Sequence, residues 1–255
     1  MNMPYLPLQP ILRTLLAVLW TLSFATGCNT NPPKTYGQVT RSFYFWKTVF
    51  ALSAEQRNIL RQLNVERLYI KLFDVDWNAT RKAALPLASV SFEEPLPPEI
   101  AMVPVVYITN KTLVNLPDTM VTSLADSVYH KMQTLLAKSG TKNPEEIQFD
   151  CDWTSATADK FFAFIRAFKL KLQPEQTLVS ATIRLHQVKY SSKTGIPPAD
   201  RGVLMFYNMG NFKHPHTGNS ILDLNEARRY LQPLNRYPLP LDVALPLFSW
   251  GVVFR

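Results

Sequence analysis

The stretch that decides the fold is residues 145–154, EEIQFDCDWT. Ile147 and Phe149 are the apolar residues that a buried strand requires. Asp150 and Asp152 then follow two residues apart, and because side chains alternate along a strand, both carboxylates point to the same face. A buried carboxylate is costly unless it is paired or hydrogen-bonded. The stretch therefore predicts a buried strand that ends in two acids with a common partner or ligand.

Six further runs of β-branched and aromatic residues predict strands, at 42–46, 67–77, 102–109, 178–186, 202–209 and 241–250. Segments of helical character separate many of them, at 53–64, 118–140, 155–172 and 220–234. Alternating strands and helices, with strands that are apolar almost throughout, indicate parallel strands with crossover helices. The prediction is an α/β fold, a TIM (β/α)₈-like barrel. The sequence stops where an eighth unit would begin, so we expect the last strand to be missing from this chain. An open doubly wound sheet is the alternative.

The first 28 residues differ in character from the rest. One cation, Arg13, precedes the apolar run LLAVLWTLSFA, which has the length of a signal-peptide core. The run ends in Ala-Thr-Gly-Cys28, which resembles the lipobox of bacterial lipoproteins, where the cysteine is lipidated. An ordinary cleaved signal or an uncleaved anchor is the alternative. The predicted division is a signal peptide at 1–28, a polar tether at 29–40 and a barrel domain at 41–255.

Charge and cysteine content limit the partners. The chain has 255 residues with a net charge of +8, and its basic residues are scattered. There is no basic-aromatic nucleic-acid motif, so we expect no nucleic acid, and a glycan or an envelope surface as partner. With Cys28 lipidated, only Cys151 remains and no internal disulfide can form. We predict no cofactor and no metal, because His214 and His216 lack a third ligand.

In barrels the chemistry lies at the C-terminal ends of the strands. On the strand at 178–186, Ser180, Thr182, Arg184 and His186 share the face that should point inward. The other strand ends supply carboxylates, aromatic rings and amides, a composition typical of a polar ligand pocket. These residues are Tyr44, Trp46, Asp74, Asp76, Trp77, Tyr107, Thr109, Asn110, Asp150, Asp152, Trp153, Met205, Tyr207, Asn208, Phe248 and Trp250.

From this set we predict catalytic and binding roles. The catalytic candidates are Asp150, Asp152 and Tyr207. The substrate-binding candidates are Trp46, Asp74, Asp76, Trp77, Arg184, His186, Asn208 and Trp250. The alternative is structural: Arg184 would neutralise Asp150 or Asp152 in a buried ion pair, and the tryptophans would be core residues.

Two of the strand ends resemble those of family-18 glycoside hydrolases, the chitinases and related endoglycosidases. IQFDCDWT matches the two inner aspartates of the family pattern D-x-x-D-x-D-x-E at Asp150 and Asp152. MFYN matches the pattern M-x-Y-D at Met205 and Tyr207. The resemblance implies a TIM barrel in which the middle aspartate and the tyrosine orient the acetamido group of the substrate. Trp250 would correspond to the tryptophan on the floor of the family's site.

The departures from the family pattern concern the chemistry itself. The catalytic acid falls on Thr154, which cannot protonate a leaving group. The first aspartate falls on Ile147, and the strand-six aspartate falls on Asn208. The family's activity therefore does not transfer with the motif.

A second resemblance is to uncharacterised bacterial envelope proteins, many of them predicted lipoproteins. These contain segments like QFDCDW and SATIRLHQVKY and share the layout from about residue 41 to 255. Together, the residues predict an exported, lipid-anchored, glycosidase-like barrel in the bacterial cell envelope. It would act on or bind an envelope or environmental glycan and attach to the membrane through Cys28. The alternative is a non-catalytic glycan-binding or structural envelope lipoprotein.

Overall fold

The computed structural model describes residues 39–172, 177–210 and 217–251. The chain divides into two units, Met1–Val39 and Thr40–Arg255, and nearly all of the description concerns the second. The predicted signal peptide, the lipidation site Cys28 and the predicted tether up to residue 38 lie outside the described residues. In the part of the chain that is described, no helix is long and apolar enough to cross a bilayer.

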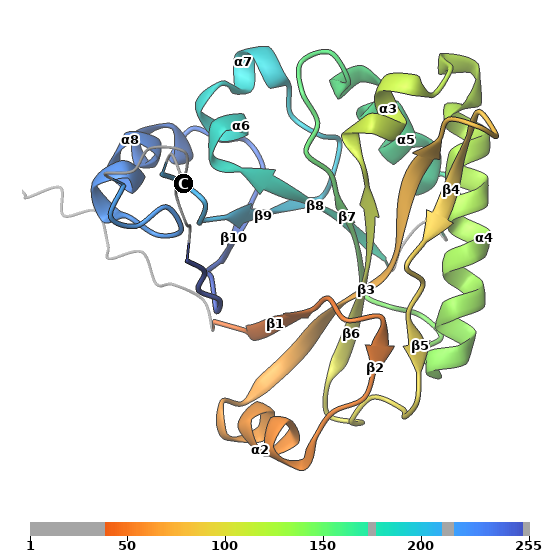
Figure 1. The fold of residues 1–255 in the computed structure, drawn as a ribbon, viewed down its shortest axis with the longest axis vertical. Helices are drawn as coiled ribbons and strands as arrows, with labels where there is room; N and C mark the ends of the chain where they lie inside the picture. Colours follow the sequence, from red (N-terminus) through yellow and green to blue (C-terminus); the bar gives the residue numbers. More distant parts are fainter. Residues whose placement is uncertain (1–38, 173–176, 211–216, 252–255) are drawn as a thin grey trace, which may run out of the picture. The chain divides into compact units, whose positions relative to one another are not determined.

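Seven parallel strands form one curled sheet in the order β1-β3-β6-β7-β8-β9-β10 (Figure 1). Their bounds are β1 (Arg41–Phe45), β3 (Val65–Asn78), β6 (Ala101–Ile108), β7 (Glu146–Asp150), β8 (Leu178–Arg184), β9 (Arg201–Met205) and β10 (Leu241–Ala244). β1 and β10 are the two edges, and within the described residues they do not pair with each other. The fold is thus an α/β TIM-like half-barrel, as the strand pattern predicts.

Helices connect most of the strands. They are α2 (Ala54–Gln62), α3 (Asn110–Asn115), α4 (Val121–Ser139), α5 (Ala158–Lys169), α6 (Leu185–Lys189), α7 (Ser191–Thr194) and α8 (Leu224–Leu234), with a 3₁₀ turn η1 (Asp118–Met120). A capping box of Ser53 and Gln56 starts α2, because each side chain accepts a hydrogen bond from the backbone N–H of the other residue. Gly140 ends α4 in the left-handed conformation, with φ of 79°, which glycine adopts without strain.

The main core lies between the sheet and the helices that cover it. Phe149 of β7 packs edge-on against Phe164 and Phe168 of α5, with ring centroids 5.0 and 4.7 Å apart. Trp153 is fully buried, stacks on Phe161, and donates from Nε1 to the carbonyl of Thr194 at 2.9 Å. Trp153 is therefore a core residue with its one polar atom satisfied.

A second, smaller cluster lies on the other face of the sheet, inside the half-barrel. It contains Tyr69, Val103, Val105, Val203 and Met205, and Tyr44, Tyr207 and Ala244 pack against it. Strands of this sheet are thus covered by side chains on both faces, which explains why they read as continuously apolar.

Several predicted strands are too long. β8 ends at Arg184, where the side chain of Gln187 accepts the backbone N–H of Arg184 at 2.8 Å and the chain turns into α6. His186 therefore lies on a helix, and its predicted place on the inward face of a strand is wrong. β7 ends at Asp150, β9 at Met205 and β10 at Ala244, so the final stretch predicted up to residue 250 is strand only at its start.

Two small strand pairings have no counterpart among the predicted strands. β3 runs past the sheet to Asn78 and forms an antiparallel hairpin with β4 (Ala83–Leu87). β2 (Val49–Phe50) and β5 (Ser91–Phe92) form a separate two-stranded pair. We call the end of the half-barrel at which the parallel strands have their C-terminal ends the mouth. The hairpin lies at this end of β3.

Candidate functional site

Strand register aligns the inward-facing side chains in layers. Tyr107 of β6 pairs with Asp74 of β3 on one side and with Asp150 of β7 on the other. A β-bulge between Lys71 and Phe73 of β3 adds one residue to that strand. Because an extra residue shifts the alternation of faces, Asp74 instead of Phe73 lies in the inner layer.

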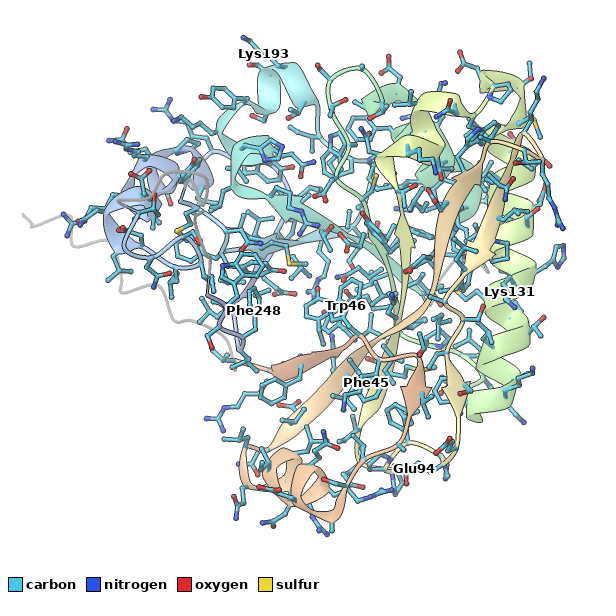
Figure 2. The ribbon with its side chains drawn as sticks, in the orientation of Figure 1. Phe45, Trp46, Glu94, Lys131, Lys193 and Phe248 are labelled. Atoms are coloured by element: carbon cyan, nitrogen blue, oxygen red, sulfur yellow. The ribbon has the colours of Figure 1, made fainter. Side chains whose placement is uncertain are left out.

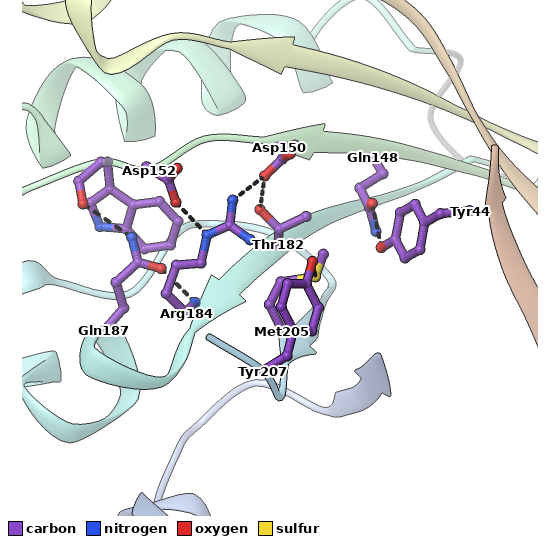
Figure 3. A network of polar contacts seen from close by, with 10 residues as sticks. Tyr44, Gln148, Asp150, Asp152, Thr182, Arg184, Gln187, Met205 and Tyr207 are labelled. Carbon is purple, nitrogen blue, oxygen red and sulfur yellow. Dashed lines mark hydrogen bonds and ion pairs between the residues drawn. The ribbon is translucent and has the colours of Figure 1, made fainter. Parts of the chain in front are cut away.

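Arg184 joins Asp150, the last residue of β7, and Asp152, which follows β7 (Figure 3). Its Nη2 lies 3.2 Å from Oδ1 of Asp150, and its Nε donates to Oδ1 of Asp152. Thr182, two residues earlier on β8, donates its hydroxyl to the same Asp150 oxygen at 2.5 Å. The side chain of Asp150 is only 6% exposed, whereas that of Asp152 is 51% exposed. The inner aspartate is held through Oδ1 by Thr182 and Arg184, and the outer one remains accessible to a ligand.

The environment changes the ionisation of this cluster. Burial raises the pKa of Asp150, and the nearby Arg184 charge opposes that rise. Burial also raises the pKa of the Tyr207 phenol, whose hydroxyl donates to the sulfur of Met205 at 3.2 Å. The phenol therefore keeps its proton at neutral pH and remains a hydrogen-bond donor.

A further polar chain lies deeper in the half-barrel (Figure 3). Tyr44 donates its hydroxyl to Oε1 of Gln148 at 2.7 Å, as Figure 3 shows. Gln148 in turn donates from Nε2 to the hydroxyl of Ser180 at 3.2 Å. Burial raises the pKa of Tyr44, which therefore stays neutral. The chain supports the layer below Asp150 with satisfied hydrogen bonds.

Aromatic rings lie on both sides of the acidic cluster. On the β1 side, Trp46 stacks on Tyr44 with centroids 5.9 Å apart, and Nζ of Lys71 lies 5.5 Å from the Trp46 ring. On the β10 side, Phe248 lies edge-on to Tyr207 at 5.8 Å. Figure 2 shows Trp46 beside β1 and Phe248 near the far edge of the sheet; the two are 41% and 46% exposed. Both rings can contact the apolar side of a ligand.

Three predicted residues have no direct hydrogen bond to the cluster of Asp150, Asp152, Arg184 and Tyr207. Asp74 pairs with Lys71, whose Nζ lies 2.9 Å from Oδ1 of Asp74. Trp250 is 5.6 Å from Phe248 and donates from Nε1 to the hydroxyl of Ser220 at 3.4 Å. His186 is exposed on α6; partial burial and Arg184 lower its pKa, and the charge of Asp152 opposes this.

Other predicted residues make structural contacts instead. Asp76 accepts a hydrogen bond from Thr109 at 2.8 Å and pairs with Lys111 at 3.2 Å, which lowers the pKa of Asp76. Trp77 packs against the main core, on the face away from the interior of the half-barrel. Both lie where β3 continues into its hairpin with β4, and Asp76 is level with the C-terminal end of β6.

Of the three positions that depart from the family pattern, Ile147 is buried in β7, whereas Thr154 and Asn208 are exposed. Thr154 places its hydroxyl 3.4 Å from that of Thr157 and offers no ionisable group. Asn208 has a positive φ of 56° and donates its backbone N–H to the carbonyl of Ile221 at 2.7 Å. Asn208 therefore shapes the turn after β9, a conformation that asparagine tolerates.

Sequence reasoning did not select Lys71 and Gln148. The alternation of side chains along a strand could have identified both residues. Lys71 lies two residues after Tyr69, and Gln148 lies two residues before Asp150, so each shares a strand face with that neighbour. Phe248 was noted at its strand end but was not chosen as a binding residue.

The arrangement offers a carboxylate, a guanidinium, a phenol and flanking rings. It can accept and donate several hydrogen bonds to a polar ligand while stacking on its apolar parts. Among the residues described, no group of three or more His, Cys, Asp or Glu side chains is arranged to hold a metal ion.

Comparisons with known proteins give matches among solved structures only; no family model and no curated protein matches. The spore cortex-lytic enzyme of Bacillus cereus matches 83% of this chain and 51% of its own, at 18% identity and a TM-score of 0.47. This chain thus spans about half the length of that enzyme. A GH18 chitinase from Pseudoalteromonas aurantia matches 82% of this chain and 81% of its own, at 9% identity and a TM-score of 0.44. These are distant similarities of fold, and the second belongs to the family that the strand motifs resemble.

Proposed function

We propose that the half-barrel binds a glycan at its mouth without hydrolysing it. The observation that carries this proposal is the asymmetry of the two aspartates. Arg184 bonds to both, Asp150 is buried, and Asp152 presents a half-exposed carboxylate. Exposed rings follow the two edge strands of the same sheet, Trp46 after β1 and Phe248 after β10. A charged acceptor and exposed rings suit sugar hydroxyls and sugar faces. The motif resemblance at Asp152 and Tyr207 supports a glycan as the ligand class.

Hydrolysis requires more than this cluster provides. Glycosidases use a protonated carboxylic acid that reaches the glycosidic oxygen, together with a second carboxylate. Asp150 has the raised pKa of such an acid, but its side chain is only 6% exposed and is already bonded by Thr182 and Arg184. Thr154 has no acidic group. Hydrolysis remains the second candidate function, and the raised pKa of Asp150 is the observation that favours it.

One experiment separates these functions. The full chain is incubated with chitin oligomers, peptidoglycan fragments and common polysaccharides, and both binding heat and released reducing ends are recorded. Binding heat without release supports the proposal. Release that disappears in Asp152→Asn would establish an enzyme, and a folded protein with neither signal would point to a structural role.

We also propose that the protein is exported and lipid-anchored at Cys28 in a bacterial envelope. The apolar run before Cys28 and the small residues next to it support this. The test is incorporation of an alkyne-tagged fatty acid in a bacterial host. Wild type should carry the label in the membrane fraction and Cys28→Ser should not. Equal labelling of both proteins would overturn the proposal.

A further inference from the structure

Three carboxylates lie close together at the mouth. The register pairs Tyr107 of β6 with Asp74 of β3 on one side and with Asp150 of β7 on the other. Asp152 is joined to Asp150 through Arg184, as Figure 3 shows. The charges of Asp74 and Asp152 both act to raise the pKa of Asp150, which agrees with this proximity. We call Asp74, Asp150 and Asp152 the acidic patch.

Two cations compensate the acidic patch only in part. Lys71 pairs with Asp74. Arg184 pairs with both Asp150 and Asp152. Among the residues described, these two are the cations within ion-pair distance of the three carboxylates. Three ionised acids beside two cations leave one negative charge in excess.

His186 does not supply the missing positive charge. Partial burial and the charge of Arg184 lower its pKa, against the opposing effect of Asp152. A histidine with a lowered pKa is uncharged at neutral pH. The excess of negative charge at the mouth therefore persists at neutral pH.

The excess charge is accessible on Asp152. Its side chain is 51% exposed, and Arg184 donates to its Oδ1. A carboxylate has about four lone-pair sites, so Asp152 keeps acceptor capacity toward solvent. Asp74 adds to the negative field from below. Lys71 donates to its Oδ2 at 3.2 Å, but its buried Oδ1 accepts no hydrogen bond from a described residue.

Exposed rings are connected to the acidic patch on both sides. Trp46 lies 5.5 Å from Nζ of Lys71, the partner of Asp74. Phe248 packs edge-on against Tyr207 at 5.8 Å, and the charges of Asp150 and Asp152 both act on the phenol of Tyr207. The rings and the acids thus belong to one region of the half-barrel.

We propose that the glycan bound at the mouth carries free amino groups, as a glucosamine oligomer does, and that one ammonium group binds to Asp152. The inference rests on the proposed glycan binding and adds the charge class of the ligand. An ammonium group has three N–H donors and a full positive charge, whereas an acetamido group has one N–H and no charge. The ion pair with Asp152 therefore adds an attraction that an acetylated sugar lacks.

The overall charge of the protein favours the opposite class of ligand. The chain has a net charge of +8, which attracts an acidic glycan to the protein as a whole and repels a cationic one. At the mouth, however, an acidic glycan would meet the excess negative charge of the acidic patch. A preference for amino sugars would thus have to arise locally.

The test compares four oligosaccharides of equal length by titration calorimetry with the full chain. They are oligomers of glucosamine, N-acetylglucosamine, glucose and galacturonate, in a buffer that keeps the sugar amines charged. The glucosamine oligomer should bind at least fivefold more tightly than each of the other three. High salt should reduce this preference, because it screens the ion pair.

Two variants assign the preference to the acidic patch. Asp152→Asn removes one charge from the patch and should reduce the preference for glucosamine over N-acetylglucosamine to less than about twofold. Asp242→Asn removes the same charge near the N-terminal end of β10, away from the mouth, where Asp242 is 52% exposed and pairs with Arg201. Asp242→Asn should keep the preference of wild type. Urea unfolding confirms that both variants are folded.

The outcomes separate this inference from the proposed glycan binding. Equal or tighter binding of the acetylated, glucose or galacturonate oligomer would overturn the inference and leave glycan binding in place. A preference that survives in Asp152→Asn, or that falls equally in Asp242→Asn, would also overturn it. Absence of binding to all four oligomers would overturn the inference and contradict the proposed function as well.

Discussion

The guanidinium of Arg184 on β8 lies 3.2 Å from the carboxylate of Asp150 on the neighbouring strand β7, inside the half-barrel. A second nitrogen of Arg184 donates to Asp152. One cation thus stabilises two carboxylates that the sequence places on one face of a strand. Asp150 is buried and has a structural role, whereas the carboxylate of Asp152 is exposed and can bind a ligand.

Replacing Arg184 should destabilise the fold. Arg184→Met leaves Asp150 buried without its cation, so we expect the free energy of unfolding to fall by about 2–3 kcal/mol in urea denaturation. Arg229→Met removes an exposed helix pair and should cost less than about 0.5 kcal/mol. Adding Asp150→Asn to Arg184→Met should recover part of the loss. Equal small losses for Arg184→Met and Arg229→Met would contradict the role of this ion pair.

The raised pKa of Asp150 predicts a pH dependence of stability. Because the folded state holds the proton more tightly than the unfolded chain, this contribution is complete below the ordinary pKa of about 3.9. It is lost as pH rises through the higher pKa of the folded state. The stability of wild type relative to Asp150→Asn should therefore decrease from about pH 4 upward. Urea unfolding at a series of pH values measures this difference, and a difference that is constant or grows with pH would disagree.

Much of the sheet follows from the sequence. The strands are apolar on both faces, so their number and parallel order can be predicted from runs such as 102–109 and 178–186. Their ends cannot, because the turn at Arg184 depends on a hydrogen bond from its backbone to the side chain of Gln187. Because of this turn, His186 lies in helix α6 and not in the strand that the sequence predicts.

The site was predictable where alternation along a strand is regular. Asp150, Asp152, Thr182 and Arg184 meet because their strands are neighbours and their faces agree. Asp76 and Trp77 could not be placed in this way. β3 contains a bulge and then a hairpin with β4, and neither follows from regular alternation along the strand.

Trp153 should be a stability residue with no part in binding. Trp153→Phe leaves the buried carbonyl of Thr194 without its donor and opens space beside Phe161, so we expect a loss of about 1–3 kcal/mol in the free energy of unfolding. Trp250→Phe changes a half-exposed ring and should stay within about 0.5 kcal/mol of wild type. Chemical denaturation of both variants checks this, and similar losses in the two would count against it.

Trp46 should contribute to glycan affinity. Its ring is 41% exposed and held by Tyr44 and Lys71, so Trp46→Ala removes a preorganised stacking surface. We expect about tenfold weaker binding, equivalent to about 1.4 kcal/mol. Tyr190→Ala removes a ring of similar exposure on α6–α7 and should leave affinity unchanged. Titration calorimetry of each variant with the glycan that the wild type binds measures the two affinities. Equal losses of affinity in Trp46→Ala and Tyr190→Ala would exclude Trp46 from the site.

The most direct test of the central claim compares two matched aspartates by titration calorimetry. Asp152 and Asp242 are 51% and 52% exposed, and each pairs with one arginine, Arg184 or Arg201. Only Asp152 belongs to the cluster with Asp150, Arg184 and Tyr207 at the mouth. If the mouth binds a glycan, Asp152→Asn should weaken affinity at least tenfold while Asp242→Asn matches wild type. Unchanged affinity in Asp152→Asn, or equal losses in both variants, would contradict the account.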